Sequence, residues 1–239
     1  MSKSYSTIIL AGGLGTRMEP ITKFKPKPMI LYKGTPLVAR IINSIQPYSK
    51  EFLVTVKYLK ENFYDLPYSY KQLSLVEDNS DTMVGAFLNA CNQIKHESTD
   101  VIGISSDIVF DDEFVKKAIN LCDKNSKYDV KVFLTKSKNQ KYKKWHWVIQ
   151  DNMLKDIIIE KESTGYEKLF IVFKRSVLYS YTNGFTTNMG SDEEEFLSYE
   201  KFNSGWIYLL KRLLENKTKI GAFVLEGEVK NINSPTDLK

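Results

Sequence analysis

Short apolar segments alternate with amphipathic segments throughout the first half of the 239-residue chain, and this order limits the possible folds more than any other feature. The apolar segments are rich in β-branched residues and end in polar ones, as strands do, whereas the amphipathic segments have helical spacing. We expect strands over residues 7–12, 51–56, 73–78, 101–107 and 129–136. We expect helices over residues 36–45, 81–94 and 111–124. This alternation predicts a mostly parallel sheet with helices on both faces.

The second half of the chain has a different pattern. Strand candidates with little helix between them cover residues 145–150, 154–161 and 168–174, and they predict an antiparallel extension of the sheet. We expect an amphipathic helix over residues 203–217 and a last strand over residues 220–227. A short terminal helix should follow, because Ser234 suits the N-cap and Pro235 the first helical position. We therefore predict one α/β domain over residues 1–239.

The composition excludes few functions. Hydrophobic residues are 42% and charged residues 26% of the chain, as in ordinary globular proteins, and the net charge of +5 suits phosphorylated small molecules as well as nucleic acid. Cys91 and Cys122 lie in expected helices and predict buried thiols rather than a disulfide. The first apolar run is too short for a signal peptide, and no long apolar stretch follows, so we expect a cytoplasmic protein outside the membrane.

The segment LAGGLGTRMEPITKFKPKPM, residues 10–29, combines a glycine loop with a stiff basic tail. A phosphate-binding loop of the Walker A type would need Gly-Lys-Ser/Thr, and a dinucleotide fingerprint would need a glycine where Met18 stands. A plain glycine turn is the simplest alternative. However, glycines let backbone N–H groups approach phosphate oxygens, and the forked guanidinium of Arg17 suits the same ligand. The prolines on either side of Lys27 predict an extended backbone that delivers a second cation to these phosphates.

These residues resemble a known signature. LAGGLGTRM followed by PKPM is similar to the motif of the sugar-phosphate nucleotidyltransferases, a family that includes glucose-1-phosphate thymidylyltransferases and small cytidylyltransferases. The resemblance implies a Rossmann-like three-layer αβα sandwich with a mostly parallel central sheet and a small antiparallel extension. It also implies transfer of a nucleoside monophosphate from an NTP to a phosphorylated acceptor, with release of pyrophosphate. Residues 1–136 would then form the NTP-binding half and residues 137–239 the acceptor-binding half.

The resemblance further implies roles for individual residues. Arg17 and Lys27 would be catalytic, and Thr82 matches the threonine of a stretch that contacts base and ribose. The implied nucleotide-binding residues are Leu10, Ala11, Gly12, Gly13, Gly15, Thr16, Arg17, Glu77 and Thr82. The acidic side chains of Glu77 and Asp78 would accept from an exocyclic amine, which favours cytosine or guanine, although CTP, UTP, dTTP and GTP all remain candidates.

A magnesium site is expected at the end of the strand that precedes Asp107, where α/β sheets bind their ligands. Asp111 and Asp112 come where a helix starts, and we interpret them as caps. The family takes a second metal ligand from a C-terminal motif with two aspartates, which are Asn231 and Asn233 here. Molybdenum-cofactor guanylyltransferases and N-acetylglucosamine-1-phosphate uridylyltransferases resemble this sequence in carrying asparagine there. We therefore predict that Mg²⁺ binds Asp107 and Asn233, the alternative for Asn233 being a helix-entry turn without a metal.

The acceptor site is less defined. Glu160 and Lys161 resemble the family's acceptor-binding Glu-Lys pair, but a strand end with alternating charge would look the same. The Asn-x-Gly that follows in most sugar enzymes is missing. A sugar 1-phosphate is thus the first expectation and a non-sugar phosphate such as phosphocholine the alternative. Trp145 and Trp147 offer faces for a quaternary ammonium group, although core packing explains them equally well.

Two other functional classes fit the sequence less well than this enzyme. A regulatory subunit that binds nucleotide without catalysis should have lost Arg17, Lys27 or Asp107, and all are present. The lysine-rich stretch over residues 136–145 lacks the basic and aromatic interleaving of a nucleic-acid-binding surface, so no nucleic-acid partner is expected. The expected partners are an NTP and a phosphorylated small molecule, with a homo-oligomer possible.

Overall fold

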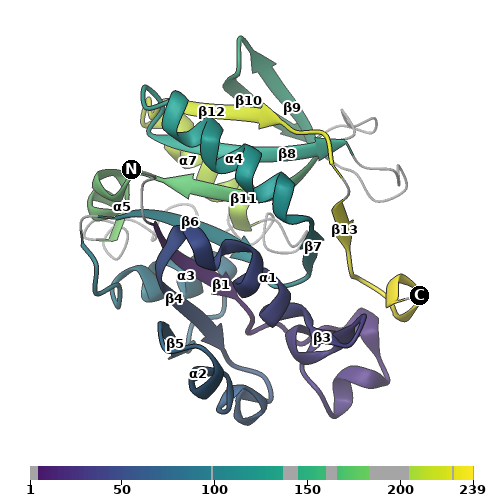
Figure 1. The fold of residues 1–239 in the computed structure, drawn as a ribbon. Coiled ribbons are helices and arrows are strands. Elements are labelled where there is room, and N and C mark those ends of the chain that lie inside the picture. The colour runs from purple at the N-terminus through teal and green to yellow at the C-terminus, as the bar shows by residue number, and fades with distance from the viewer. Residues whose placement is uncertain are drawn as a thin grey trace.

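The computed structural model describes residues 5–97, 99–136, 145–159, 166–182, 205–227 and 229–238. Its centre is a nine-stranded sheet in the order β5-β4-β1-β6-β11-β8-β12-β10-β9 (Figure 1). The strands are β1 (Tyr5–Leu10), β4 (Ser49–Val56), β5 (Leu73–Glu77), β6 (Asp100–Ser105), β8 (Val130–Lys136), β9 (Trp145–Gln150), β10 (Met153–Ile159), β11 (Tyr166–Phe173) and β12 (Ile220–Val224). Each lies within a few residues of its predicted position.

Strand direction separates two parts of this sheet. β5, β4, β1 and β6 are parallel to one another, as the alternation of strands and helices predicts. β11 is antiparallel to both of its neighbours, β6 and β8, while β8 and β12 are again parallel. β10 and β9 form the antiparallel extension at the far edge. The predicted sandwich is confirmed, but β11 comes from the second half of the chain and separates two strands of the first half.

Helices cover both faces of the sheet, and each group has its own core. α1 (Leu37–Ile45) and α4 (Asp112–Lys124) lie in front of the sheet in Figure 1. α3 (Met83–Cys91), α5 (Arg175–Thr182) and α7 (Gly205–Glu215) pack in a separate cluster. The short α2 (Leu66–Ser69) follows β4. Among the described helices, none is both long enough and apolar enough to span a bilayer.

The two cysteines belong to these cores. Cys91 lies in α3 and Cys122 in α4, and both thiols are free and buried. Burial raises the pKa of each thiol to about 12. They are therefore protonated packing residues at neutral pH, as expected from the sequence.

Two small sheets and a third apolar cluster lie beside the central sheet. β7 (Ile108–Phe110) pairs antiparallel with β13 (Val229–Asn231), and β2 (Leu31–Tyr32) pairs with β3 (Thr35–Pro36). The buried members of the cluster come from four separate segments: Met18, Ile30, Tyr32, Leu37 and Ile232. This cluster joins the loop after β1 to the C-terminal segment.

Candidate active site

The loop after β1 keeps an open backbone at the edge of the sheet. Ala11 still donates its N–H to the carbonyl oxygen of Thr55 at 3.1 Å, and the chain then leaves the sheet. A 3-10 helix follows over Thr16–Met18, and no α-helix begins before Leu37. The absence of a long helix agrees with the departure from the Walker A and dinucleotide motifs noted above.

The backbone conformation and the close neighbours of position 15 require a glycine there. Its φ of +66° lies in the left-handed region, and a Cβ atom there would stand 3.0 Å from Cβ of Lys27 and 3.1 Å from Cγ2 of Thr22. The hydroxyl of Thr22 also donates to the carbonyl oxygen of Gly15 at 3.1 Å. Glycine therefore allows the loop and the basic tail to lie directly against each other.

The extended backbone predicted for Lys27 is wrong. Lys27 begins a 3-10 helix over Lys27–Met29, in which Ile30 donates its N–H to the carbonyl oxygen of Lys27 at 3.1 Å. Pro26 is extended, and Pro28 fits the turn because a proline near the start of a helix has no N–H to lose. The turn still directs the lysine inward: Nζ lies 2.9 Å from Oδ2 of Asp107 and 3.1 Å from Oδ1 of Asn233.

Strand pairing brings Asp107 and Asn233 together from distant parts of the chain. Asp107 occupies the turn between β6 and β7, and its carbonyl oxygen accepts the N–H of Ile232 at 2.9 Å. Directly beside this bond, Asn231 pairs with Ile108 in the β7–β13 ladder. The ladder register therefore sets Asn233 beside Asp107, near the carboxyl end of β6.

Arg17 completes the group. Its Nη2 donates to Oδ1 of Asn233 at 2.8 Å, and its neighbour Met18 is fully buried with Ile232 in the third cluster. The structure thus brings together Arg17 and Lys27, predicted to bind the phosphates, and Asp107 and Asn233, predicted to bind Mg²⁺. Arg17 is exposed, whereas Lys27 and Asp107 are partly buried, with exposed side-chain fractions of 11% and 25%.

Asp237 holds this end of the chain in place, a role that the sequence analysis missed. Its Oδ2 accepts from the N–H of Asn233 at 2.8 Å, the N–H of Ser234 at 2.7 Å and the hydroxyl of Ser234 at 2.9 Å. Partial burial acts to raise the pKa of Asp237, but these hydrogen bonds lower it below the ordinary value. The signal in the sequence was an acidic residue three positions after an N-cap serine, which is the spacing of a capping box. The helix it caps is the 3-10 helix Pro235–Leu238.

The residues present suit Mg²⁺. Oδ2 of Asp107 and Oδ1 of Asn233 both lie within hydrogen-bond distance of one ammonium group, so the two oxygens converge on a common cation position. Oxygen is the ligand type that Mg²⁺ prefers, with phosphate oxygens and water as further ligands. In the described part of the chain, no group of three or more His, Cys, Asp and Glu side chains is arranged so that it could hold a metal ion by itself.

The neighbouring polar residues have other functions. Asp111 caps α4, because its Oδ1 accepts the N–H of Phe114 at 2.6 Å, and Asp112 lies in the first turn of that helix. Asp111 therefore matches its predicted role as a cap, whereas Asp112 is the first residue of the helix and not its N-cap. Oδ1 of Asn231 is buried and has no hydrogen-bond partner among the described residues.

The residues expected near the base surround the end of β5. Glu77 is half-exposed, and its Oε2 is ion-paired with Nζ of Lys60 at 2.6 Å. Asp78 is buried: its Oδ1 accepts from the N–H and the hydroxyl of Ser80 at 2.9 and 2.6 Å. Its Oδ2 lies 3.7 Å from the place that a Cβ of Gly12 would take. Asp78 therefore faces the glycine loop, whereas Glu77 is engaged with a surface lysine.

Thr82 has a structural partner. It is the N-cap of α3, and its Oγ1 accepts the N–H of Gly85 at 3.0 Å. The preceding loop is held by Lys57, whose Nζ donates to the carbonyl oxygen of Ser80 at 2.7 Å. The base-side residues thus belong to a compact turn between β5 and α3.

The acceptor side is only partly described. Glu160 and Lys161 lie outside the described residues, and so does the side chain of Trp145. Trp147 is 4% exposed and packs in the core with α3 and α7, which confirms the packing interpretation for this residue.

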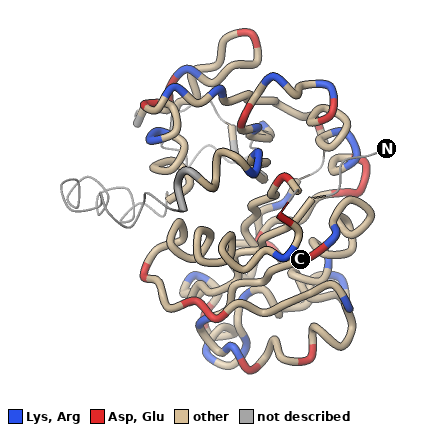
Figure 2. Tube along the Cα trace, turned by 90° about the vertical axis from the view of Figure 1, so that its left-hand side faces the viewer, with Lys and Arg blue, Asp and Glu red and all other residues tan. Residues whose placement is uncertain are grey.

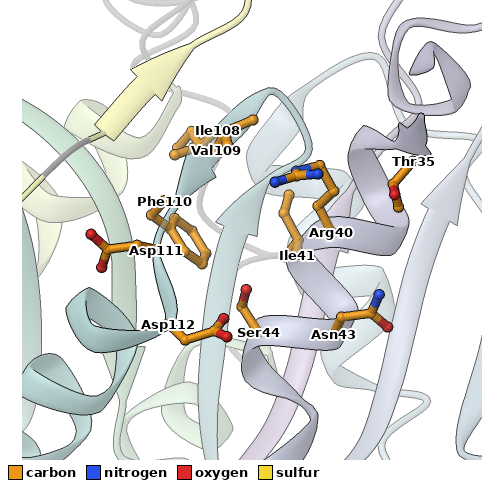
Figure 3. A pocket seen from close by; sticks show the side chains of 10 residues that line it. All are labelled: Thr35, Arg40, Ile41, Asn43, Ser44, Ile108, Val109, Phe110, Asp111 and Asp112. Carbon is orange, nitrogen blue, oxygen red and sulfur yellow. The ribbon is translucent and has the colours of Figure 1, made fainter. Parts of the chain in front are cut away.

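A pocket lies between α1 and the β7–α4 turn, and Figure 3 shows the side chains that line it. Arg40 and Ser44 come from α1, whereas Asp111 and Asp112 come from the start of α4. None of the four converging residues lines it. It is therefore separate from the candidate active site.

The charges of the described chain are mixed. Figure 2 shows Lys and Arg interspersed with Asp and Glu along the Cα trace. Within this mixed surface, the four converging residues form a site with two cations and one carboxylate near the carboxyl ends of parallel strands. Such a site suits a polyphosphate, and the fold around it is the Rossmann-like fold of nucleotidyltransferases.

Comparison with known proteins agrees with this assignment of the fold. Residues 6–143, more than half of the chain, match the nucleotidyl transferase family. The chain therefore belongs to this family, and the resemblance noted in its sequence is confirmed.

Individual relatives are more distant. The chain is 35% identical over 114 residues to a 2-aminoethylphosphonate cytidylyltransferase of Lancefieldella rimae, an alignment that covers 46% of each protein. The chain thus spans about half the length of this relative. The inositol-1-phosphate CTP transferase of T. maritima has a TM-score of 0.75 at 18% identity, covering 99% of this chain and 92% of its own. The CTP:phosphocholine cytidylyltransferase of Streptococcus pneumoniae has a TM-score of 0.70 at 19% identity, covering 98% and 96%. At such identities the solved structures show the shared fold alone.

Proposed function

We propose that this protein transfers a nucleoside monophosphate from an NTP, with CTP as the preferred substrate, to a phosphorylated small molecule. An oxygen of the acceptor phosphate attacks the α-phosphorus, the bond from that phosphorus to the bridging oxygen breaks, and pyrophosphate leaves. The observation that carries this proposal is the convergence of Arg17, Lys27, Asp107 and Asn233 beside the glycine loop. Family membership supports the reaction class.

The chain can promote this reaction by positioning and charge. The acceptor phosphate is already ionised, so no protein nucleophile or general base is needed. Arg17 offers forked donors to the phosphates, and the Lys27 ammonium offers a mobile point charge for the leaving pyrophosphate. Asp107 and Asn233 would hold Mg²⁺, which when bound neutralises charge on the α-phosphate.

The preference for CTP follows from the acid that faces the loop. A buried carboxylate can accept a hydrogen bond but cannot donate one, so Oδ2 of Asp78 favours a base with an exocyclic amine over uracil or thymine. We assign base selection to Asp78 rather than Glu77, since Glu77 is ion-paired with Lys60 on the surface. The 35% identical relative is named a cytidylyltransferase, which supports the same base. Guanine also carries an amine, so GTP is the informative competitor.

Two classes of acceptor follow. A sugar 1-phosphate is the first candidate, because the signature over residues 10–29 resembles that of sugar-phosphate enzymes, and its product would be an activated sugar for glycan or surface-polysaccharide synthesis in the cytoplasm. A small amine-bearing phosphate or phosphonate is the second, supported by the name of the 35% identical relative. The burial of Trp147 removes one of the two aromatic faces considered for a quaternary ammonium group.

The test is a matrix of CTP, GTP, UTP, ATP and dTTP against sugar 1-phosphates, phosphocholine and 2-aminoethylphosphonate, read by pyrophosphate release with Mg²⁺. We expect release with CTP and one acceptor class. Binding of CTP without release from any pair would instead support a regulatory subunit. Release with UTP or dTTP in preference to CTP would overturn the role given to Asp78.

A further inference from the structure

Lys27 occupies an unusual place within the candidate site. Its ammonium lies 2.9 Å from the carboxylate of Asp107 and 3.1 Å from the amide oxygen of Asn233, so it touches both oxygens that would hold the metal. It is well shielded, since only 11% of its side chain is exposed. In the structure a side-chain cation therefore contacts both candidate metal ligands.

We propose that Lys27 is the resident cation of this site in the nucleotide-free protein, and that it must leave before Mg²⁺ can bind. The inference rests on the proposed function only for the identity of the metal site. It makes Lys27 a competitor of free Mg²⁺ as well as a ligand of the substrate phosphates.

The charges of the site support competition. Asp107 is the one negatively charged group among the four converging residues. Lys27 lies against oxygens of both Asp107 and Asn233, and Arg17 lies against the oxygen of Asn233. Mg²⁺ binds oxygen at about 2.0–2.1 Å, so an ion held by both oxygens would lie within a few ångströms of the ammonium. At such distances, in a partly buried site, repulsion between like charges is strong. Free Mg²⁺ should therefore bind feebly.

A triphosphate resolves this conflict. Its oxygens supply the negative charge that the protein lacks, and they offer Lys27 and Arg17 alternative partners. The oxygens of Asp107 and Asn233 then become available to the metal. Mg²⁺ should thus enter together with the nucleotide rather than before it.

The local structure lets the ammonium move while the backbone stays in place. The 3-10 helix Lys27–Met29 and the close approach of Gly15 to Cβ of Lys27 fix the start of the side chain. The remaining methylene groups are flexible, and a lysine ammonium can rotate between acceptors in a way that a planar guanidinium cannot. A lysine can therefore contact Asp107 and Asn233 first and the phosphates of the nucleotide afterwards.

The experiment measures Mg²⁺ binding to the nucleotide-free protein by calorimetry, with Lys27→Met against wild type. Methionine keeps the stem and removes the charge, so we expect the Kd for Mg²⁺ to fall at least about tenfold. The matched control is Lys25→Met, which removes the same charge from an exposed side chain of the same loop and should change the Kd by less than about twofold. Equal Kd values for both variants would overturn the proposal.

Two further measurements keep the outcome interpretable. Thermal unfolding monitored by circular dichroism shows whether Lys27→Met is folded, and Lys27→Gln, a polar neutral variant, replaces it if it is not. The assay needs no turnover, so it separates the two hypotheses. Tighter Mg²⁺ binding by Lys27→Met, together with no pyrophosphate release by the wild type in any reaction, would refute the proposed function and leave this inference standing. Normal release by the wild type, together with unchanged Mg²⁺ binding by Lys27→Met, would do the opposite.

Discussion

The two ends of the candidate nucleotide site are built in different ways. At the phosphate end, Arg17, Lys27, Asp107 and Asn233 come from three distant segments, and Arg17 and Asn233 stand 216 positions apart in the sequence. At the base end, Asp78, Ser80 and Thr82 bind one another within a single turn between β5 and α3. One end depends on tertiary pairing, whereas the other is held by local hydrogen bonds.

This difference predicts different responses to substitution. Groups that share partners are energetically coupled, so changes at the phosphate end should be strongly non-additive. Changes at the base end should alter base preference, with little effect on catalysis. The phosphate end also carries two cations to one carboxylate, whereas the base end presents the buried carboxylate of Asp78 to the glycine loop. The predictions below test this contrast, beginning with the largest effect.

Loss of the carboxylate at position 107 should be the most damaging change. Asp107→Asn removes the charged metal ligand and the ion-pair partner of Lys27 together, and kcat should fall at least about 10³-fold. The control is Asp111→Asn, because asparagine caps helices as well as aspartate does and Asp111 caps α4. Steady-state pyrophosphate release measures both. Comparable losses in the two variants would show that the metal carboxylate was misassigned.

Lys27→Ala should lower kcat about 10²-fold, the size expected when one preorganised charge is lost from the transition state. The fold should persist, because the 3-10 helix at this position is made by backbone hydrogen bonds. Lys25→Ala is the control, with an exposed side chain and the same change in charge. A variant at 27 with normal turnover would mean that the basic tail has only a structural role.

At the base end, Asp78→Asn should change preference rather than rate. An amide can donate to the carbonyl oxygen of uracil, so the ratio of kcat/KM for CTP over UTP should fall about tenfold. Glu77→Gln should leave the ratio unchanged, because Glu77 faces Lys60 on the surface. The two ratios are measured in competition assays with both nucleotides. A larger shift in the Glu77 variant would return base selection to that residue.

The residues of the phosphate end could be predicted from the sequence although they come from distant parts of the chain. Arg17 and Lys27 belong to one motif, and Asp107 follows a buried strand, so each could be named from its local context. The contact between Lys27 and Asn233 could not be derived locally, because it depends on the β7–β13 register and on the burial of Met18 against Ile232. Resemblance to a family supplied Asn233 where periodicity could not.

The failures of prediction have physical causes. The extended backbone expected at Lys27 assumed that Pro28 excludes helical geometry before it, yet a single 3-10 turn tolerates that proline. The position of β11 was missed because strand order depends on contacts far apart in the chain, here between Phe170 and both Ile104 and Phe133. Asp78 and Glu77 were indistinguishable as adjacent acids until their hydrogen bonds and exposure separated them.

The smallest effect concerns Asp237, which touches the site only through its neighbours. Its carboxylate binds the backbone N–H groups of Asn233 and Ser234, so Asp237→Ala should free the turn that aims the Asn233 side chain. We expect kcat to fall about fivefold to tenfold, with KM for CTP nearly unchanged. A double-mutant cycle with Asn233→Ala separates positioning from general stability. In the Asn233→Ala background, Asp237→Ala should change kcat by less than about twofold, and a full loss in that background would rule out a role through Asn233.

The pH dependence of stability gives an independent test of the same contact. The pKa of Asp237 in the folded protein lies below its ordinary value of 3.8, so its ionised form is stabilised by folding. This stabilisation is fully present above that ordinary value and is lost as the pH falls through the lower folded pKa. The Tm difference between wild type and Asp237→Asn should therefore be constant above about pH 5 and shrink under more acidic conditions. A Tm difference that stays constant down to about pH 2 would show that ionisation of Asp237 does not stabilise the turn, and that charge has no part in orienting Asn233.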